Sequence, residues 1–476
     1  MRVVLVHPLG SNWVSGHKDA SSLANRMPPI GLLSLAAWLE KEGIETKIID
    51  CLGPTVAPGG VVQRIVQEEP DLLGFSTTTS AFLDAYQLTE SIKKIKPNLK
   101  TVFGGVHVSA IGGDLLRQFP EIDFLVMGEG ERTLSELASG KNSAEIDGLI
   151  FRNGQEIIVN RPREPIADLD SLPLPAYDKL AGFPNHYQLP LFSYINAPGA
   201  TMITSRGCPY QCSYCDRSVF KRGYRFNSAE YIYEHMAFLR GRFGVRHVNI
   251  YDDLFTLHRG RIEALCERLI AKPLAMRFNC AVRVGHADDD LLRLLRRAGC
   301  LMVSLGIESG DAALLETHKP GVYVDDVKAT VARIQARGLR AKGLFMMGLP
   351  GETEESIKKT SDFVISLGLD DMNMAKFTPF HGAPTWKTIG QYGELKEDWR
   401  LMNCLNFVFR PWGIQSWERL DQLYNTHVKR FYSDPGWRRR LVKRCWQHRH
   451  SFWRLLRHMP GFLGAMRSFE PQRKKS

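Results

Sequence analysis

The sequence predicts an α/β protein in which an open parallel sheet is followed by a partial (β/α)6 barrel and a helical C-terminal region. Two observations carry this prediction. Short apolar runs alternate with segments of helical periodicity, which is the pattern of parallel strands joined by crossover helices. A proline-punctuated stretch separates two such series. We therefore divide the 476 residues into open sheet, linker, barrel and C-terminal region at 1–145, 146–200, 201–385 and 386–476.

The open sheet starts with the apolar run 3–6, which is followed directly by His7. A helix over 30–42 stops at Gly43, a residue that suits a helix C-cap. Further strands are expected at 46–50, 72–76, 101–103 and 124–126, with helices at 61–68 and 85–95 between them. Ligands of such sheets bind beyond the carboxyl ends of the strands.

The linker is predicted to begin with a hairpin around the turn Asn153-Gly154 and to continue as an extended segment rich in proline. Six strand-then-helix units follow, two short of a full barrel. The expected strands lie at 201–204, 247–251, 276–282, 302–305, 343–347 and 374–377, and the helices at 229–243, 261–270, 290–298, 324–336 and 354–367. Functional groups are expected in the loops that follow these strands.

Three cysteines follow the first barrel strand. Cys208, Cys212 and Cys215 form the spacing C-x3-C-x2-C, and no fourth cysteine lies nearby. Three thiolates fill three corners of a cubic [4Fe–4S] cluster and leave one iron open, whereas an electron-transfer ferredoxin normally closes all four. A structural zinc site requires four ligands in paired spacing, which this stretch lacks. The spacing therefore favours a cluster with an open iron.

The segment GCPYQCSYC resembles the cluster motif of radical S-adenosylmethionine (SAM) enzymes, and the flanking Arg206, Pro209 and Tyr214 agree with the motif. The resemblance implies that the amino and carboxylate groups of SAM chelate the open iron. It also implies SAM contacts in the later loops. The residues concerned are Asp252, Asp253, Arg283, Glu308, Ser309, Gly348 and Gly351.

Some of these residues also have a simpler interpretation. Asp252 and Asp253 are equally typical of a helix N-terminus, where acids favour the helix dipole. Arg283 suits a carboxylate, since guanidinium pairs with it bidentately, but Gly285 stands where relatives often have an acid. His381, after the last strand, either points into a substrate cavity or is structural. No catalytic residue is assigned.

The open sheet resembles the cobalamin-binding domain, of flavodoxin-like or Rossmann-like fold, that precedes the barrel in many radical SAM enzymes. The stretches PPIGLLSLAAWLEKEG, GFSTTTS, FGGVHVSA and DFLVMGEGERTLSEL carry the likeness. It implies a cobalamin site at Ser76, Thr77, Thr78, Gly104, Gly105, His107, Glu129 and Gly130. The signature D-x-H-x-x-G is absent after the first strand. Either cobalamin binds without a protein imidazole on cobalt, or the domain has lost the ability to bind cobalamin. A dinucleotide site is not supported, because the third glycine of its fingerprint is missing.

The net charge of +11 is concentrated at the end of the chain. Residues 436–476 hold 12 lysines and arginines and one acid, with aromatic residues at helical spacing. This pattern is typical of contact with an anionic membrane surface, or of a last helix packed on the barrel. Nucleic acid is disfavoured, since no RNA-binding fold is visible. Without a spanning segment or a signal peptide, and with scattered cysteines, we expect a cytoplasmic protein that touches the membrane at most peripherally.

The resemblance implies reductive cleavage of SAM to a 5′-deoxyadenosyl radical, which takes a hydrogen atom from an unactivated C–H bond of an apolar substrate. Cobalamin-dependent C-methylation is the leading interpretation. The alternative is oxidative cyclisation or rearrangement of a tetrapyrrole or lipid, as in the group of the anaerobic magnesium-protoporphyrin ester cyclase and the hopanoid-modifying enzymes. An electron donor such as flavodoxin or ferredoxin is implied. An RNA-modifying methylthiotransferase is disfavoured, because it would need a second cysteine triad that the N-terminal region lacks. A non-enzymatic iron–sulfur scaffold is also disfavoured, because it would have no need of the SAM turns.

Overall fold

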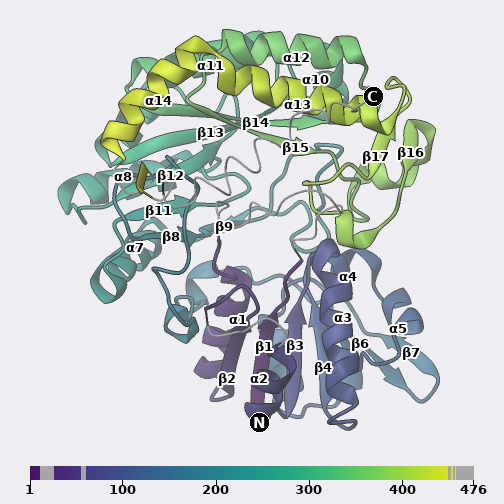
Figure 1. Ribbon diagram of the computed structural model, residues 1–476. Helices are drawn as coiled ribbons and strands as arrows, with labels where there is room; N and C mark the ends of the chain where they lie inside the picture. Colours follow the sequence, from purple (N-terminus) through teal and green to yellow (C-terminus); the bar gives the residue numbers. More distant parts are fainter. Residues whose placement is uncertain (11–25, 55–59, 449–451, 454–455, 457–476) are drawn as a thin grey trace.

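The computed structural model describes residues 1–10, 26–54, 60–448, 452–453 and 456. The structure contains two large sheets, the mainly parallel N-terminal sheet, which lies below in Figure 1, and the parallel barrel sheet, which lies above it. Both predicted parallel α/β units are present, so the fold class expected from the sequence is confirmed.

The N-terminal sheet has the strand order β2-β1-β3-β4-β5-β6-β7. Strands β1 to β5 are parallel, and their order is the flavodoxin-like one, in which ligands bind where the order reverses, between β1 and β3. The hairpin β6–β7, expected in the linker, instead pairs antiparallel with β5 and extends this sheet. The strands are β1 (Arg2–His7), β2 (Glu45–Asp50), β3 (Leu72–Ser76), β4 (Lys100–Gly104), β5 (Phe124–Val126), β6 (Leu149–Asn153) and β7 (Glu156–Val159).

Helices cover both faces of this sheet because its strands are apolar on both sides. In β1, Val4 and Val6 belong to the apolar core on one face, and Val3 and Leu5 to the core on the other. The helices are α1 (Ile30–Lys41), α2 (Val61–Gln67), α3 (Thr79–Lys93), α4 (Val106–Ile111), α5 (Asp114–Gln118) and α6 (Glu131–Ala138).

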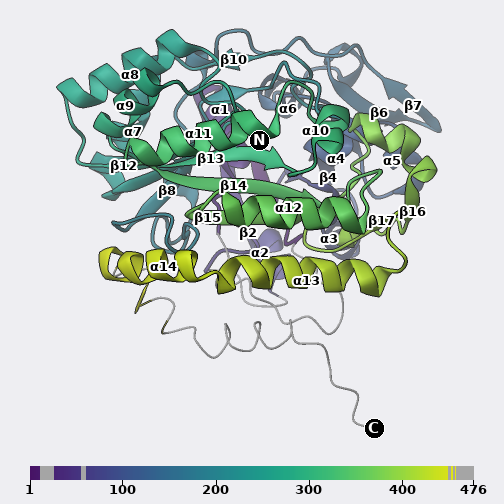
Figure 2. The same ribbon diagram turned by 90° about the horizontal axis from the view of Figure 1, so that it is seen from above.

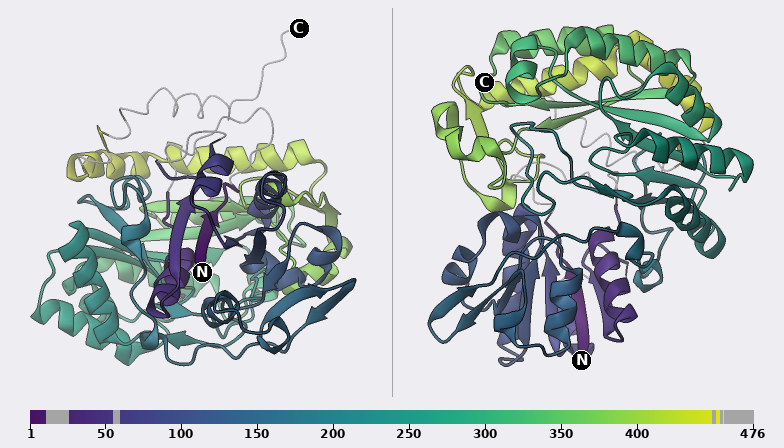
Figure 3. Two further views of the ribbon diagram at one scale, coloured as in Figure 1. Left: turned by 90° about the horizontal axis from the view of Figure 1, so that it is seen from below. Right: turned by 180° about the vertical axis from the view of Figure 1, so that it is seen from behind.

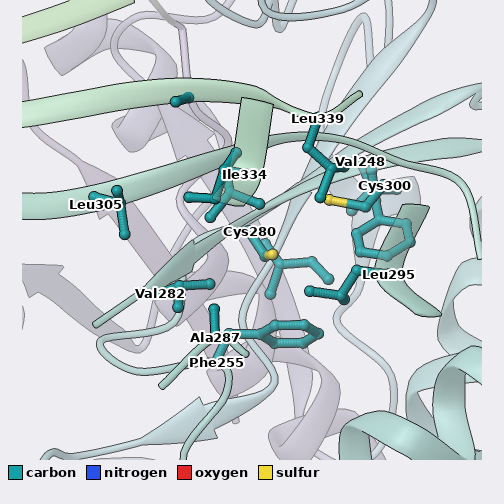
Figure 4. Close-up of a cluster of buried hydrophobic side chains, with 14 of the residues drawn as sticks. Val248, Phe255, Cys280, Val282, Ala287, Leu295, Cys300, Leu305, Ile334 and Leu339 are labelled. Atoms are coloured by element: carbon teal, nitrogen blue, oxygen red, sulfur yellow. The ribbon is translucent and has the colours of Figure 1, made fainter. Parts of the chain in front are cut away.

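The barrel sheet contains six parallel strands in the order β15-β14-β13-β12-β11-β8. One face packs against the surrounding helices, and Figure 4 shows part of that apolar core, with Val248, Cys280, Cys300 and Leu305 pointing into it. The strands are β8 (Gly199–Met202), β11 (His247–Ile250), β12 (Arg277–Val282), β13 (Cys300–Glu308), β14 (Arg340–Met347) and β15 (Asp371–Lys376); the helices are α7 (Ala229–Phe243), α8 (Arg259–Ala271), α9 (Asp289–Arg297), α10 (Ala312–His318), α11 (Val324–Ala336) and α12 (Glu354–Ser366).

The C-terminal region is less helical than the sequence suggested. Short 3-10 turns η4 (Pro384–Gln391) and η5 (Trp399–Leu401) and a two-stranded ribbon, β16 (Gly393–Leu395) with β17 (Phe409–Pro411), precede the first α-helix. This segment reaches from the barrel to the N-terminal sheet (Figures 1 and 3). There η5 packs on α3, and the Trp399 ring lies 5.7 Å from the Phe82 ring.

Helix α13 (Trp417–Ser433) runs alongside α12, and α14 (Pro435–Gln447) continues beyond its end, as Figure 2 shows from above. The basic stretch begins in α14, and part of it faces the protein: Arg444 Nη2 donates to Asp370 Oδ1 at 2.6 Å, and Arg440 Nη2 donates to the Leu369 carbonyl at 3.0 Å. Most of the predicted tail beyond 448 lies outside the described residues. In the part of the chain that is described, no helix is long and apolar enough to cross a membrane.

Candidate functional site

The three motif cysteines lie on a loop closed by the short antiparallel pair β9 (Ser205–Arg206) and β10 (Arg225–Phe226). All three thiols are free and half-buried. Gly207 opens the loop with φ +86°, and a Cβ atom there would lie 1.9 Å from the Gly223 carbonyl oxygen, so only glycine fits. The loop follows β8 and therefore stands at the carboxyl ends of the barrel strands, as expected.

The donor set fits an iron–sulfur cluster. Burial, then the nearby Asp253 carboxylate, raises the pKa of Cys215 to about 12, so a thiolate there requires a neighbouring cation such as iron. Among the described residues, no set of three or more His, Cys, Asp and Glu side chains surrounds a single metal-ion position. A cubic cluster does not need such a set, because each thiolate binds a different iron.

Arg283, the predicted partner of the SAM carboxylate, lies beside this loop. Its Nη1 is 4.0 Å from Cys212 Sγ, and its Nη2 donates to the Pro320 carbonyl at 2.7 Å. The guanidinium stacks 3.7 Å from the centre of the Tyr210 ring, whose hydroxyl is 2.6 Å from His286 Nε2. These contacts hold a positive charge next to the cysteines, where an anionic ligand would meet it.

Glu308 ends β13 in a left-handed conformation, with φ +69°. Its Oε1 accepts a hydrogen bond from Lys319 Nζ at 2.7 Å, and the two side chains are only 12% and 9% exposed. The Lys319 ammonium also donates to the Gly306 carbonyl at 2.8 Å. Lys319 was missed by sequence reasoning, because it lies in the loop after α10 and no local pattern marks it.

Ser309 and Asp252 have their polar atoms engaged within the protein. Ser309 Oγ is 3.0 Å from Thr360 Oγ1 and accepts from the Asp311 amide at 3.1 Å. The Asp252 carboxylate accepts from the amide and the hydroxyl of Thr204, at 2.5 and 2.6 Å. These contacts fix the ends of β13 and β8, so the geometry does not favour direct SAM contacts from either side chain.

Asp253 differs from its neighbour. Burial and the adjacent Asp252 raise its pKa, while a hydrogen bond to the Gly207 backbone works in the opposite direction. Its charge also acts on Cys208 and Cys215. Of the two predicted acids, Asp253 is therefore the one that faces the cysteine loop.

The turn after β14 carries Gly348 and Gly351, both with positive φ, of +94° and +81°. Glu352 closes it: its buried carboxyl group accepts a hydrogen bond from the Gly348 amide. His318 ties this turn to the cysteine loop, with Nε2 2.8 Å from the Pro350 carbonyl oxygen and Nδ1 2.7 Å from a serine hydroxyl of that loop. Sequence reasoning placed Glu352 in this turn without a role for its side chain, and it assigned no role to His318, whose contacts are distant in sequence.

Because Glu352 is buried, we expect the stability of the folded chain to depend on pH. Burial raises its pKa from 4.5 to about 8. Between these pH values the folded chain holds a proton that the unfolded chain has released, so stability falls as pH rises, by up to about 1.4 kcal/mol per pH unit. Glu352→Gln keeps this side chain neutral, and its melting temperature is expected to depend less on pH across that window. Parallel melting profiles for variant and wild type would contradict the assignment.

A cavity of about 200 Å³ lies at the carboxyl end of the N-terminal sheet. It is bounded by β1, β3, β4 and β5 and by α1 and α6. Of the residues predicted for cobalamin, five line it: Ser76, Gly104, Gly105, Glu129 and Gly130. Gly105 has φ +99°, and a Cβ atom there would lie 2.6 Å from the Thr77 carbonyl oxygen, so the backbone can adopt this course only with glycine.

The other three predicted residues do not line the cavity. Thr77 Oγ1 donates to the Gly104 carbonyl at 3.2 Å, and Thr78 Oγ1 is 3.4 Å from Ser80 Oγ. His107 points to the C-terminal segment: its ring centre is 4.5 Å from that of Trp399, and burial lowers its pKa to about 3. The sequence placed it correctly at a strand end, but α4 directs its side chain into the contact between the two sheets.

The lining of this cavity suits contact with one face of a flat, largely apolar group such as the corrin ring of a cobalamin. Apolar side chains and glycines make up most of its lining, and the lining residues include no histidine. Cobalt would therefore receive no imidazole from this wall, in line with the missing D-x-H-x-x-G signature.

Filling this cavity is expected to prevent cobalamin binding. A Cβ atom on Gly104 would meet Val126 at 3.6 and 3.7 Å, ordinary contacts, so Gly104→Leu adds bulk to the cavity without backbone strain. We expect cobalt per chain to fall at least about tenfold, equal to about 1.4 kcal/mol of binding free energy, with iron unchanged. Gly241→Leu on α7, where a Cβ would meet nothing within 4 Å, is the control. Full cobalt content in Gly104→Leu would refute the site.

Comparison with known proteins gives a family match for the barrel and another for the N-terminal sheet. The model of the radical SAM superfamily matches residues 202–364, and that of the B12 binding domain matches residues 16–138. An uncharacterised methyltransferase of Pyrococcus horikoshii is 30% identical, over 89% of this chain and 91% of its own length. The anaerobic magnesium-protoporphyrin IX monomethyl ester cyclase of Rubrivivax gelatinosus is 26% identical, over 92% of this chain and 78% of its own length.

A solved structure shares the fold. The radical SAM methyltransferase TsrM of Kitasatospora setae, with cobalamin and a [4Fe–4S] cluster bound, has a TM-score of 0.65 and 22% identity, over 82% of this chain and 78% of that one. A cysteine loop on a partial barrel that faces a B12-binding sheet defines the class. The chain belongs to the family of radical SAM enzymes that carry a B12-binding domain. Its cofactors are a [4Fe–4S] cluster, SAM and cobalamin.

Proposed function

We propose that the enzyme methylates an unactivated carbon of an apolar substrate. One observation carries the proposal: the cysteine loop itself closes the cobalamin cavity. Arg206, two residues before Cys208, lines that cavity, as do Val219 and Phe220, which follow Cys215. The two cofactor sites therefore face each other across one interface, as group transfer between them requires.

The cluster and SAM, when bound, supply the radical that removes a hydrogen atom, and cobalamin supplies the methyl group. The chain's residues hold and orient these groups. Arg283 and Lys319 put two positive charges near the cysteine loop, where the SAM carboxylate would meet one of them. Glu308 would accept from the amino or ribose groups of SAM. The exposed side chains of Ile203 and Tyr251, directly after β8 and β11, support an apolar substrate.

A second candidate function is oxidative cyclisation or rearrangement of a tetrapyrrole or lipid without methyl transfer. The likeness to the Rubrivivax gelatinosus cyclase, which extends over 92% of this chain, favours it. Both functions use the same cysteine loop and the same sheet edge, so the fate of the SAM methyl group distinguishes them.

The reaction also needs an electron, for which we propose a small donor protein such as flavodoxin or ferredoxin. Contact of the basic tail with an anionic membrane stays a prediction. Arg438, Arg439 and Val442 of α14 are exposed and agree with it, but Arg440 and Arg444 bind the barrel.

The test of methylation is an anaerobic reaction of the holoenzyme with SAM that carries a trideuterated methyl group, in the presence of a small-molecule extract of the source cells. The proposal predicts a product in which a trideuteromethyl group on carbon has replaced one hydrogen. A cyclised or oxidised product without deuterium would overturn it in favour of the second candidate.

A further inference from the structure

Two arginines next to the cysteine loop reach across to the N-terminal sheet. Arg206 Nη1 donates to Glu129 Oε1 at 2.9 Å, and its Nη2 donates to Glu131 Oε1 at 2.5 Å. Arg225 Nη1 donates to Glu129 Oε2 at 2.9 Å. Ser34 Oγ of α1 donates to Glu131 Oε1 at 3.1 Å. We call these five side chains the interdomain clamp.

The clamp is shielded from water. The side chains of Glu129 and Glu131 are 5% exposed, and those of Arg206 and Arg225 are 14% and 15% exposed. Burial alone would raise the pKa of Glu129, but the hydrogen bond from Arg225 and the charge of Arg206 bring it below its usual value. Removing one member would leave a buried charge without its partner, which is strongly unfavourable.

The clamp touches both cofactor sites. Arg206 and both glutamates line the cobalamin cavity. Only Gly207 separates Arg206 from Cys208, and the Gly207 backbone packs closely against the Gly223 carbonyl. A guanidinium that binds two carboxylates at once fixes the direction of the contact between the two segments as well as its length. A change in the clamp therefore moves the first cysteine relative to the sheet edge.

We propose that Arg206 is a positioning residue that sets the separation of the cluster and cobalamin through Glu129 and Glu131. The inference deepens the proposed function, but it depends only on both cofactors being bound in one chain and requires no methyl transfer. Misplacement by about 1 Å can reduce a reaction rate about 100-fold, so such a device bears directly on turnover.

The test is pulsed electron paramagnetic resonance of the substrate-free holoenzyme, which measures the magnetic coupling between the reduced cluster and cob(II)alamin. Wild type is expected to give one narrow distribution of couplings. In Arg206→Met the distribution is expected to be broad. Arg206→Lys is expected to lie between them, because one ammonium does not reproduce the two-pronged contact. Iron and cobalt are quantified in each sample.

Arg163→Met is the matched control. Arg163 Nη2 donates to Glu136 Oε2 of α6 at 2.7 Å, and its side chain is 14% exposed, as that of Arg206 is. A general loosening of α6 would broaden the coupling in Arg163→Met as well, and this result would overturn the proposal. A narrow distribution in Arg206→Met, or no coupling in wild type, would also overturn it. If Arg206→Met does not load both cofactors, Glu131→Gln is measured instead, with the same broadening expected.

Discussion

Cys208→Ala is expected to abolish reductive cleavage of SAM. The variant keeps only Cys212 and Cys215, and two thiolates do not hold a cluster that needs three corners. We expect anaerobic formation of 5′-deoxyadenosine to fall at least about 1,000-fold, equal to about 4 kcal/mol of activation free energy. The measurement is 5′-deoxyadenosine by liquid chromatography after reduction, together with the iron content of the same sample.

Cys445→Ala is the control for this variant. Cys445 is half-buried, like the motif cysteines, but it belongs to α14. Its replacement is expected to leave iron content and SAM cleavage at the wild-type level. Undiminished cleavage by Cys208→Ala would remove the basis of the cluster assignment.

Glu308→Gln is expected to raise the KM for SAM by about 10- to 100-fold, the effect of losing a charged partner in a buried hydrogen bond. The variant also leaves the Lys319 ammonium without the carboxylate that it contacts at 2.7 Å. Thermal stability should therefore fall together with SAM affinity. The measurements are the initial rate of SAM cleavage against SAM concentration and the melting temperature.

Two further variants separate SAM binding from stability. Asp123→Asn breaks a similarly shielded pair, in which Lys93 Nζ is 2.8 Å from Asp123 Oδ2, at the end of the N-terminal sheet away from both cofactor sites. It is expected to lower stability and leave the KM unchanged. Glu308→Gln combined with Lys319→Met removes both charges and is expected to recover stability but not SAM affinity. Wild-type KM in the Glu308 variants would contradict a SAM contact.

The sequence predicts most of the fold because the signals for it are local. Apolar runs such as 3–6 and helical segments such as 30–42 each indicate one strand or helix without knowledge of the rest. The C-terminal segment was predicted less well. Residues 386–476 were expected to be helical, but Trp386 and Trp399 lie in the short 3-10 turns η4 and η5, and both rings pack against His381. Apolar residues that bury themselves in a contact between sheets carry no periodicity.

The site could be predicted where one stretch carries it and not where distant segments meet. The cysteine triad and the glycines at the sheet edge stand in recognisable motifs. Lys319 and His318 gain their roles only through contacts with Glu308 and Pro350. Glu129 was predicted at the sheet edge, but its pairing with the arginines beside the cysteines depends on how the two sheets dock. The way in which the two sheets pack against each other does not affect the spacing of residues along the sequence.

The most direct test of the central claim compares two products of SAM in one anaerobic reaction of the holoenzyme with substrate extract. C-methylation consumes one SAM as the source of the radical and one as the source of the methyl group. The account therefore predicts 5′-deoxyadenosine and S-adenosylhomocysteine in equal amounts, both lost in Cys208→Ala. Formation of 5′-deoxyadenosine without S-adenosylhomocysteine would contradict methyl transfer and leave cyclisation or oxidation as the reaction.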